Sequence, residues 1–180
     1  MLEEIQNLDL RELLREAKSE ECYQAYLKFL KIESEVFGYS CFLDVQNLKS
    51  REQFMETMVT RMRQIAQTEE EKKLAEDYNK LYILLLYQRT KLHKILKQVD
   101  IENSNKVNLY KDIIFQLYDG SFEKFKDVAN FTISVLERLF EFGKNSRLSS
   151  QVKGNLEFEK NYYGILGKFV FDGDVFNRKL

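Results

Sequence analysis

The chain has 180 residues, of which 44% are hydrophobic and 32% are charged, so it can bury a sizeable core and is not a disordered chain. Proline is absent and glycine occurs only 7 times, whereas a β-sandwich or barrel needs many turns built from these residues. Nucleic-acid binding proteins usually show a basic stripe or a high pI. The net charge of -1 and the pI of about 6.0 therefore indicate no nucleic-acid partner. We therefore expect an all-α protein, a single-domain antiparallel helical bundle of about eight or nine helices.

Apolar residues at helical spacing predict the first elements. A first helix is expected over residues 2–17, with a break near Asn7. Ser19, which two acidic residues follow, is a typical N-cap for a second helix over residues 20–30. Residues 33–38 interrupt the apolar pattern, and Gly38 suits a loop. The apolar stripe then resumes over residues 41–48.

Two capping boxes mark helix starts in the middle of the chain. Ser50 with Gln53 predicts the start of a helix that ends near residue 66. Thr68 with Glu71 predicts the start of a long helix that ends near residue 99. The polar residues 100–106 follow as a connection.

The last third predicts two or three more helices. A short helix is expected over residues 107–118, and a turn at Asp119 leads to Ser121, which can cap a helix that ends at Gly143. Residues 144–155 form a polar connector, and residues 156–180 form a last aromatic helix or a docked tail. We therefore divide the chain into a helical domain at 1–143 and a segment at 144–180 that packs on it.

Few residues suit catalysis or ligand binding. His93 is the single histidine, and Cys22 and Cys41 are the only cysteines, so neither a His-rich metal site nor a disulfide framework is expected. There is no glycine-rich phosphate loop, and the Asp172-Gly173-Asp174 stretch lacks the spaced ligands of an EF-hand. We expect no enzyme activity of its own, no cofactor and no metal.

The expected location is cytoplasmic. No signal peptide is visible, and the longest apolar run, residues 81–87, is far shorter than the ~20 residues that span a bilayer.

Four stretches carry a family resemblance. They are Leu-Arg-Glu-Leu-Leu at residues 10–14, the aromatic segment at 23–33, the segment at 42–49, and the segment at 113–125 that runs into Asp-Gly-Ser-Phe. Together they resemble the regulator of G-protein signalling (RGS) domain, which shows a leucine pair, an aromatic helix with a Phe-Leu-x-x-Glu phrase, and a later helix that leads into an Asp-Ser-aromatic turn. The resemblance covers roughly residues 8–139, and residues 51–106 agree only in length and helicity.

The resemblance implies a function without chemistry of the domain itself. RGS domains are helical bundles that bind the switch regions of a Gα subunit and speed its GTP hydrolysis by holding the transition-state geometry. Three loops make the contact in that family, and here they would be residues 34–39, 100–106 and 119–124. The implied partner-binding residues are Ser34, Glu35, Phe37, Gly38, Asp119, Ser121 and Lys124.

The match is degenerate at the first of these loops. Active members carry a Glu-Asn pair there, whereas this chain has Phe37 and Gly38. Because the amide that reaches the switch residues is missing, the resemblance implies weak or absent GTPase acceleration. The implied function is an RGS-like protein-interaction domain whose partner is a Gα subunit or another protein, and which is cytoplasmic or held at the inner membrane face through that partner.

Other interpretations stay open. The heptad-like leucines and tyrosines of the helix at 69–99 suit an unrelated helical adaptor that self-associates. His93 on an apolar helix suits a ligand- or haem-binding helical sensor. Ser121 can equally be only a helix cap, and Lys124 only part of a solvated face. The sequence leaves the oligomeric state open.

Overall fold

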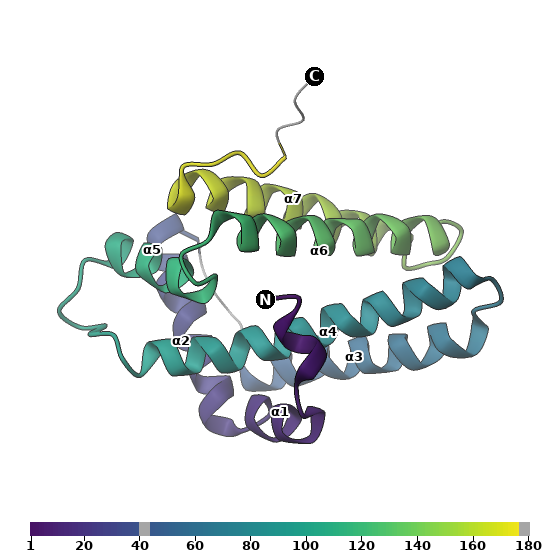
Figure 1. Ribbon diagram of the computed structural model, residues 1–180, viewed down its shortest axis with the longest axis horizontal. Helices are drawn as coiled ribbons and strands as arrows, with labels where there is room; N and C mark the ends of the chain where they lie inside the picture. Colours follow the sequence, from purple (N-terminus) through teal and green to yellow (C-terminus); the bar gives the residue numbers. More distant parts are fainter. Residues whose placement is uncertain (40–43, 177–180) are drawn as a thin grey trace. The chain divides into compact units, whose positions relative to one another are not determined.

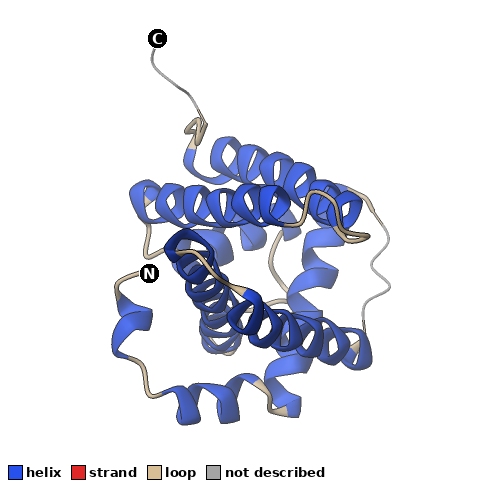
Figure 2. Ribbon diagram, turned by 90° about the vertical axis from the view of Figure 1, so that its right-hand side faces the viewer, coloured by secondary structure: helices blue, strands red, loops and turns tan. Residues whose placement is uncertain are grey.

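The computed structural model describes residues 1–39 and 44–176, and within these ranges every regular element is a helix. Figures 1 and 2 show helices joined by short loops, without a strand among the described residues. The elements are η1 (Glu4–Asn7), a 3-10 helix, and the α-helices α1 (Leu10–Ala17), α2 (Glu20–Phe37), α3 (Val45–Ile65), α4 (Glu69–Leu96), α5 (Lys106–Leu117), α6 (Phe122–Phe142) and α7 (Ser149–Phe171). The all-α prediction is confirmed, but the expected eight or nine helices exceed the 7 α-helices found in the described part of the chain.

One difference lies at the start of α3. The helix begins at Val45 and runs through Ser50, so the capping box expected at Ser50 does not start a helix. The carboxylate of Asp44 accepts a hydrogen bond of 2.8 Å from the backbone N–H of Asn47, which satisfies a donor of the first turn there. Since neither glycine nor proline lies between Asp44 and Ile65, nothing interrupts the helix at Ser50.

Two other differences concern expected loops. Helix α2 continues through residues 33–37 and ends at Gly38, whose left-handed φ of 73° closes the helix with a hydrogen bond from its N–H to the carbonyl of Ser34. The polar residues in this stretch are part of the last turns of α2 and not of a loop. Helix α7 begins at Ser149, so residues 149–155 are helical where a connector was expected.

Several expected helix ends are confirmed. Asn7 ends η1 and the carboxylate of Asp9 caps α1, which is the break expected in the first helix. The hydroxyls of Ser19 and Ser121 accept hydrogen bonds from the third backbone N–H that follows each of them. Thr68 and Glu71 form the reciprocal pair of hydrogen bonds expected of a capping box, each 3.1 Å long.

The chain forms two compact units, and the long helices α3 and α4 supply residues to both. The first unit comprises Met1–Glu56 and Tyr82–Gly120, and the second comprises Thr57–Leu81 and Ser121–Leu180. Residues 144–176 belong to the second unit together with α6, and the domain boundary expected at residue 143 stays a prediction.

Each unit has its own core. In the first unit, α2 packs on α5, where the buried rings of Phe29 and Tyr110 stack at 5.7 Å between centroids. In the second unit, α6 packs along α7, and the buried ring of Phe125 lies 5.1 Å from that of Phe171. Gly167 lets the segment after α7 pack back on that helix, because a Cβ there would lie 2.6 Å from the side chain of Val175.

Candidate functional site: the predicted partner-binding residues and a buried polar network

The first group of predicted partner-binding residues lies at the C-terminal end of α2. Glu35, Phe37 and Gly38 are exposed there. The ring of Phe37 also packs edge-on against Tyr110 of α5, with 5.5 Å between the ring centroids. Ser34 is buried, and its hydroxyl donates a 2.7 Å hydrogen bond to the carbonyl of Lys31. Ser34 therefore bonds within α2, whereas Glu35, Phe37 and Gly38 form a surface.

The second group follows α5. Asp119 has a left-handed φ of 54°, and its carboxylate accepts a 2.7 Å hydrogen bond from Nζ of Lys91. Gly120 adopts a φ of 68°, and a Cβ at that position would lie 2.9 Å from the ring of Phe115. Ser121 is the N-cap of α6, and its hydroxyl accepts from the N–H of Lys124. Capping accounts for Ser121 without a partner.

The second group spans the boundary between the two units. Phe37 contacts α5 in its first half, at Tyr110, whereas Asp119 follows the end of that helix. Ser121 and Lys124 belong to the second unit. The expected middle loop, residues 100–106, is held by its own contacts, because the carboxylate of Asp100 accepts from both the backbone and the side chain of Asn103. The same contacts hold the pKa of Asp100 below its usual value.

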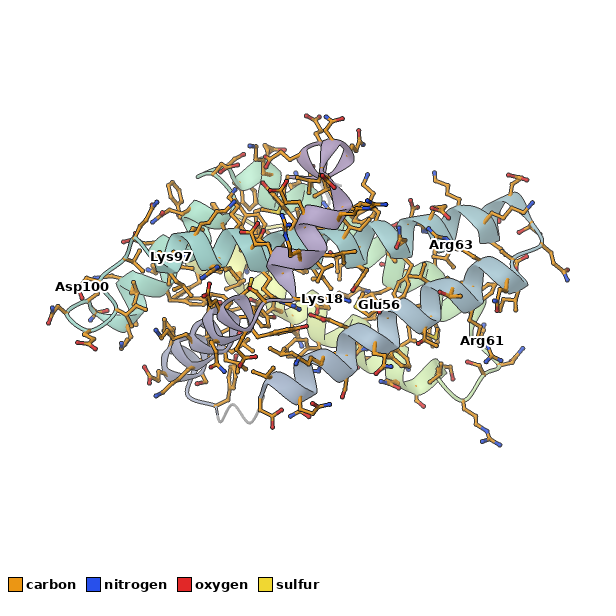
Figure 3. All side chains as sticks on the ribbon, turned by 90° about the horizontal axis from the view of Figure 1, so that it is seen from below. Lys18, Glu56, Arg61, Arg63, Lys97 and Asp100 are labelled. Atoms are coloured by element: carbon orange, nitrogen blue, oxygen red, sulfur yellow. The ribbon has the colours of Figure 1, made fainter. Side chains whose placement is uncertain are left out.

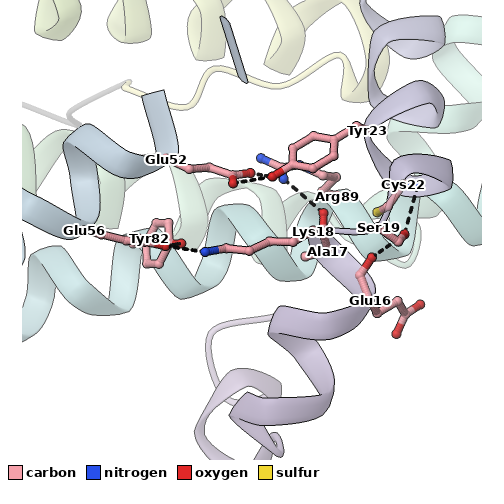
Figure 4. A network of polar contacts seen from close by, with 10 residues as sticks. All are labelled: Glu16, Ala17, Lys18, Ser19, Cys22, Tyr23, Glu52, Glu56, Tyr82 and Arg89. Carbon is pink, nitrogen blue, oxygen red and sulfur yellow. Dashed lines mark hydrogen bonds and ion pairs between the residues drawn. The ribbon is translucent and has the colours of Figure 1, made fainter. Parts of the chain in front are cut away.

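A buried polar network in the first unit was not expected from the sequence (Figure 4). Glu52 of α3 pairs with Nη1 of Arg89 of α4, and the side chain of each residue is only 8% exposed. The phenol of Tyr23 donates a 2.6 Å hydrogen bond to the other oxygen of Glu52. Arg89 also donates to the carbonyl of Ala17, so the network joins α1, α2, α3 and α4.

Two tyrosine rings hold Arg89 in place, in addition to its ion pair with Glu52. Its guanidinium lies 5.0 Å from the ring centroid of Tyr23 and 5.6 Å from that of Tyr26, which is cation–π geometry. Its buried Nε has no hydrogen-bond partner. Burial, with the hydrogen bond to Glu52, raises the pKa of Tyr23 well above its usual value, so this phenol stays protonated as a donor.

Other glutamates of the first unit are bound in the same way. Glu56, one turn after Glu52, accepts from Nζ of Lys18 and from the phenol of Tyr82. Burial acts to raise the pKa of Glu56, but these two hydrogen bonds outweigh it and the net shift is downward. Glu33 is only 4% exposed and accepts from the phenols of Tyr39 and Tyr110 at 2.7 and 2.6 Å.

The sequence did contain one signal for this network. Glu52 stands on the same face of α3 as the buried Leu48, Val59 and Met62, so it occupies an apolar position of the helical pattern. A glutamate at such a position needs a buried partner. The sequence could have predicted that a cation lies opposite, but only the packing of α3 on α4 shows that it is Arg89.

The network is suited to hold helices together rather than to catalyse a reaction. Both oxygens of Glu52 and both oxygens of Glu33 already accept hydrogen bonds, so neither carboxylate offers a ready proton acceptor. Within residues 1–39 and 44–176, no group of three His, Cys, Asp or Glu side chains is arranged to hold a metal ion. Cys41 lies outside the described residues.

The residues that suggested self-association or ligand binding lie on α4. Its leucine and tyrosine face is buried inside the chain at Leu74, Tyr78, Leu81, Leu92 and Leu96. Leu85 of the same face is 39% exposed, so packing within the chain covers most of this face but not all of it. His93 is half-buried on the same helix.

The most exposed apolar side chains lie on α7. Phe158 is 64% exposed and Ile165 is 54% exposed, and the ring of Phe158 stacks on that of Tyr162, one turn further along the helix. Their spacing places them on one side of α7, away from the buried Tyr163 and Leu166.

Comparison with known proteins gives no match to a family model, to a curated protein or to a solved structure. None of the helices described here has a long enough apolar stretch to cross a bilayer. The function therefore has to be inferred from the residues and their geometry.

Proposed function

We propose that the chain is a protein-interaction domain that acts by docking and carries out no chemistry of its own, and that a Gα subunit is its partner. The resemblance of residues 10–49 and 113–125 to RGS domains names this partner. The observation that supports docking is the exposed C-terminal end of α2, where Glu35, Phe37 and Gly38 reach the surface on a firmly anchored helix.

This surface is held in place before a partner arrives. The ring of Phe37 packs on Tyr110, and the phenol of Tyr39 donates to the buried Glu33. Residues that are already ordered lose less conformational entropy on binding, so a small surface can contribute more to affinity. A tethered end of α2 is therefore a better docking surface than an unanchored loop at these positions would be.

The same residues favour binding over GTPase acceleration. Phe37 and Gly38 stand where active RGS domains carry Glu and Asn, and neither can donate a side-chain hydrogen bond to a switch residue. The remaining contacts bind the partner about equally well in its ground and transition states, which gives affinity without a faster chemical step.

The first experiment measures binding to purified Gα subunits of several subclasses, each loaded with GDP, with GDP and aluminium fluoride, or with a slowly hydrolysed GTP analogue. Biolayer interferometry is expected to show binding that Glu35→Lys weakens, because Glu35 is exposed on the docking surface. Glu157→Lys, an exposed glutamate of α7, is the matched control and should bind as the unchanged chain does. Absence of binding to every subclass in every nucleotide state would remove the Gα proposal.

The second experiment restores the missing amide. Gly38→Asn should fit, because asparagine tolerates the left-handed region better than most residues and no atom lies within 4 Å of the Cβ position. Single-turnover GTP hydrolysis by the bound Gα subunit is expected to speed up with Gly38→Asn and to stay unchanged with Gly38→Ala. Equal rates for the two variants would show that residue 38 does not face the switch regions.

A further inference from the structure

The N-terminal segment Met1–Lys18, which holds η1 and α1, lies against α3 and α4 within the first unit (Figure 1). We propose that this segment is a strap that detaches as one piece when its glutamate contacts are lost, and that it then uncovers an apolar seat on α3 and α4. The seat consists of Met55, Tyr82, Ile83, Leu86 and Tyr87.

Polar contacts at both ends of the strap depend on glutamates. At its C-terminal end, Lys18 lies beside Glu56 (Figure 3), with 2.6 Å between Nζ and Oε1. The same carboxylate also accepts from the phenol of Tyr82. Nearby, the carbonyl of Ala17 accepts from Arg89 at 3.2 Å, and Arg89 is itself held by Glu52 (Figure 4).

The other contacts lie along the strap. Glu4 of η1 accepts from the phenol of Tyr87 of α4, and the amino group of Met1 lies 3.5 Å from the same carboxylate. Glu16 lies 3.9 Å from Nζ of Lys94. Each of these contacts is lost or weakened when its glutamate loses its charge.

The apolar attachment of α1 itself is small, and Met1 and Ile5 are the other buried apolar residues of the segment. Leu13 and Ala17 of α1 pack on Tyr82 and Leu86 of the seat, whereas Leu10 and Leu14 of the same helix point to solvent. A helix of 8 residues is too short to be stable by itself, since isolated helices need about 12–15 residues. Once the polar contacts are lost, α1 is therefore expected to leave the seat and to unwind.

The charged groups around the glutamates set the direction of the pH effect. Glu56 faces Lys18 and Tyr82, and Glu4 faces Tyr87, Lys91, Asp119 and the amino group of Met1. The hydrogen bond from Tyr87 is the largest influence that holds the pKa of Glu4 below its usual value. Both carboxylates have a lowered pKa, so the charged, attached form prevails near neutral pH and is lost as the solution becomes acidic.

The test removes the charges without acid. Hydrogen exchange of the full chain is measured at pH 7 for a variant with both Glu4→Gln and Glu56→Gln. We expect exchange in residues 10–17 to become at least about tenfold faster while exchange in α5 and α6 stays unchanged. Binding of the dye bis-ANS should rise as the seat is uncovered. Glu12→Gln, at an exposed position of α1 itself, and Glu76→Gln, on an ion pair with Arg63 in the second unit, are the controls and should change neither readout.

The outcomes are distinguishable. If residues 10–17 exchange no faster than in the unchanged chain, the glutamates do not hold the strap and the proposal is wrong. If the double variant loses helical circular dichroism as a whole, Lys18→Gln provides the same measurement with all carboxylates in place. Acceleration of α5 together with residues 10–17 in that variant would show unfolding of the whole first unit and would overturn detachment as a separate step.

Discussion

At the scale of single residues, the buried pair of Glu52 and Arg89 is the feature that sequence patterns predict least well. Removing two charges from water is costly, and the pair is tolerated because Tyr23, Ala17 and two aromatic rings supply further contacts. With Tyr23 and Ala17, the network around this pair joins four helices, so it fixes how they meet rather than adding a large net stability. Removing one partner of the pair should therefore destabilise the chain more than replacing both partners with apolar residues.

Arg89→Met should destabilise the chain by about 3–5 kcal/mol, because it leaves the charge of Glu52 buried without its cation. A variant that also carries Glu52→Leu should recover most of that loss, since no buried charge remains. Urea denaturation followed by circular dichroism gives both values. A double variant as unstable as Arg89→Met would show that the network contributes more than the cancellation of two charges.

Cys22 gives a second residue-scale prediction. Its side chain is buried in α2, and burial raises the pKa of its thiol to about 11. In a Cys41→Ser variant, Cys22 should stay unlabelled by a thiol reagent at pH 8 and react only when denaturant unfolds the chain. Rapid labelling under native conditions would mean that α2 opens easily at this point.

At the scale of helices, a capping pattern in the sequence marks a helix start only where its side chains bond to the first turn. Thr68 and Glu71 form a reciprocal capping box at the start of α4. Ser50 and Gln53 show the same sequence pattern in the interior of α3, where Asp44 supplies the cap instead. The pattern at Ser50 does not start a helix because burial is continuous along α3 at Leu48, Glu52 and Val59.

Matched substitutions test this difference. Thr68→Ala should destabilise the chain by about 1 kcal/mol, because it removes a hydrogen bond to the first turn of α4. Ser50→Ala should be neutral or slightly stabilising, because alanine is the better residue in a helix interior. Thermal unfolding compares the two variants under one condition. An equal loss of stability for both would place a helix start at Ser50 after all.

At the scale of the whole molecule, the two units differ in how polar groups are used. The first unit binds its glutamates with phenols, as Glu33, Glu52 and Glu56 show. The second unit has ion pairs nearer the surface, such as Arg63 with Glu76 and Arg138 with Asp77. The lowered pKa values of Glu4 and Glu56 link the stability of the first unit to pH.

Acid is expected to lower the stability of the folded chain. Glu4 and Glu56 have pKa values below the usual 4.5, so the unfolded chain binds protons first as the pH falls. The stabilisation is complete above about pH 5 and is lost as the pH falls below about 4.5 toward the folded values. Melting temperatures at about pH 7, 5 and 3.5 should therefore drop mainly in the last step. The Glu4→Gln and Glu56→Gln variant should drop less over that step, and an equal drop would assign the effect to other carboxylates.

The expected helix bounds were close wherever local chemistry decides them. Ser19, Thr68 and Ser121 cap helices as predicted, because a hydroxyl that bonds to its own first turn needs no distant partner. The loop expected at residues 34–39 was wrong because the burial of Ile32, Glu33 and Ser34 against the rest of the first unit continues α2 to Phe37. The site residues were predicted by resemblance, and the structure shows Ser34 buried within α2 and Ser121 used as a cap.

By itself, the amino-acid sequence determined the helical class, most helix ends and the scarcity of catalytic side chains, because composition, periodicity and capping act over a few residues. Only the tertiary structure decided which glutamate meets Tyr23, Tyr82, Tyr87, Tyr110 or Arg89, since those partners lie 26 to 83 positions apart in the chain. It also decided that the end of α2 is an anchored surface and that residues 1–18 lie against α3 and α4. Both depend on the long-range packing of helices, which no local pattern records.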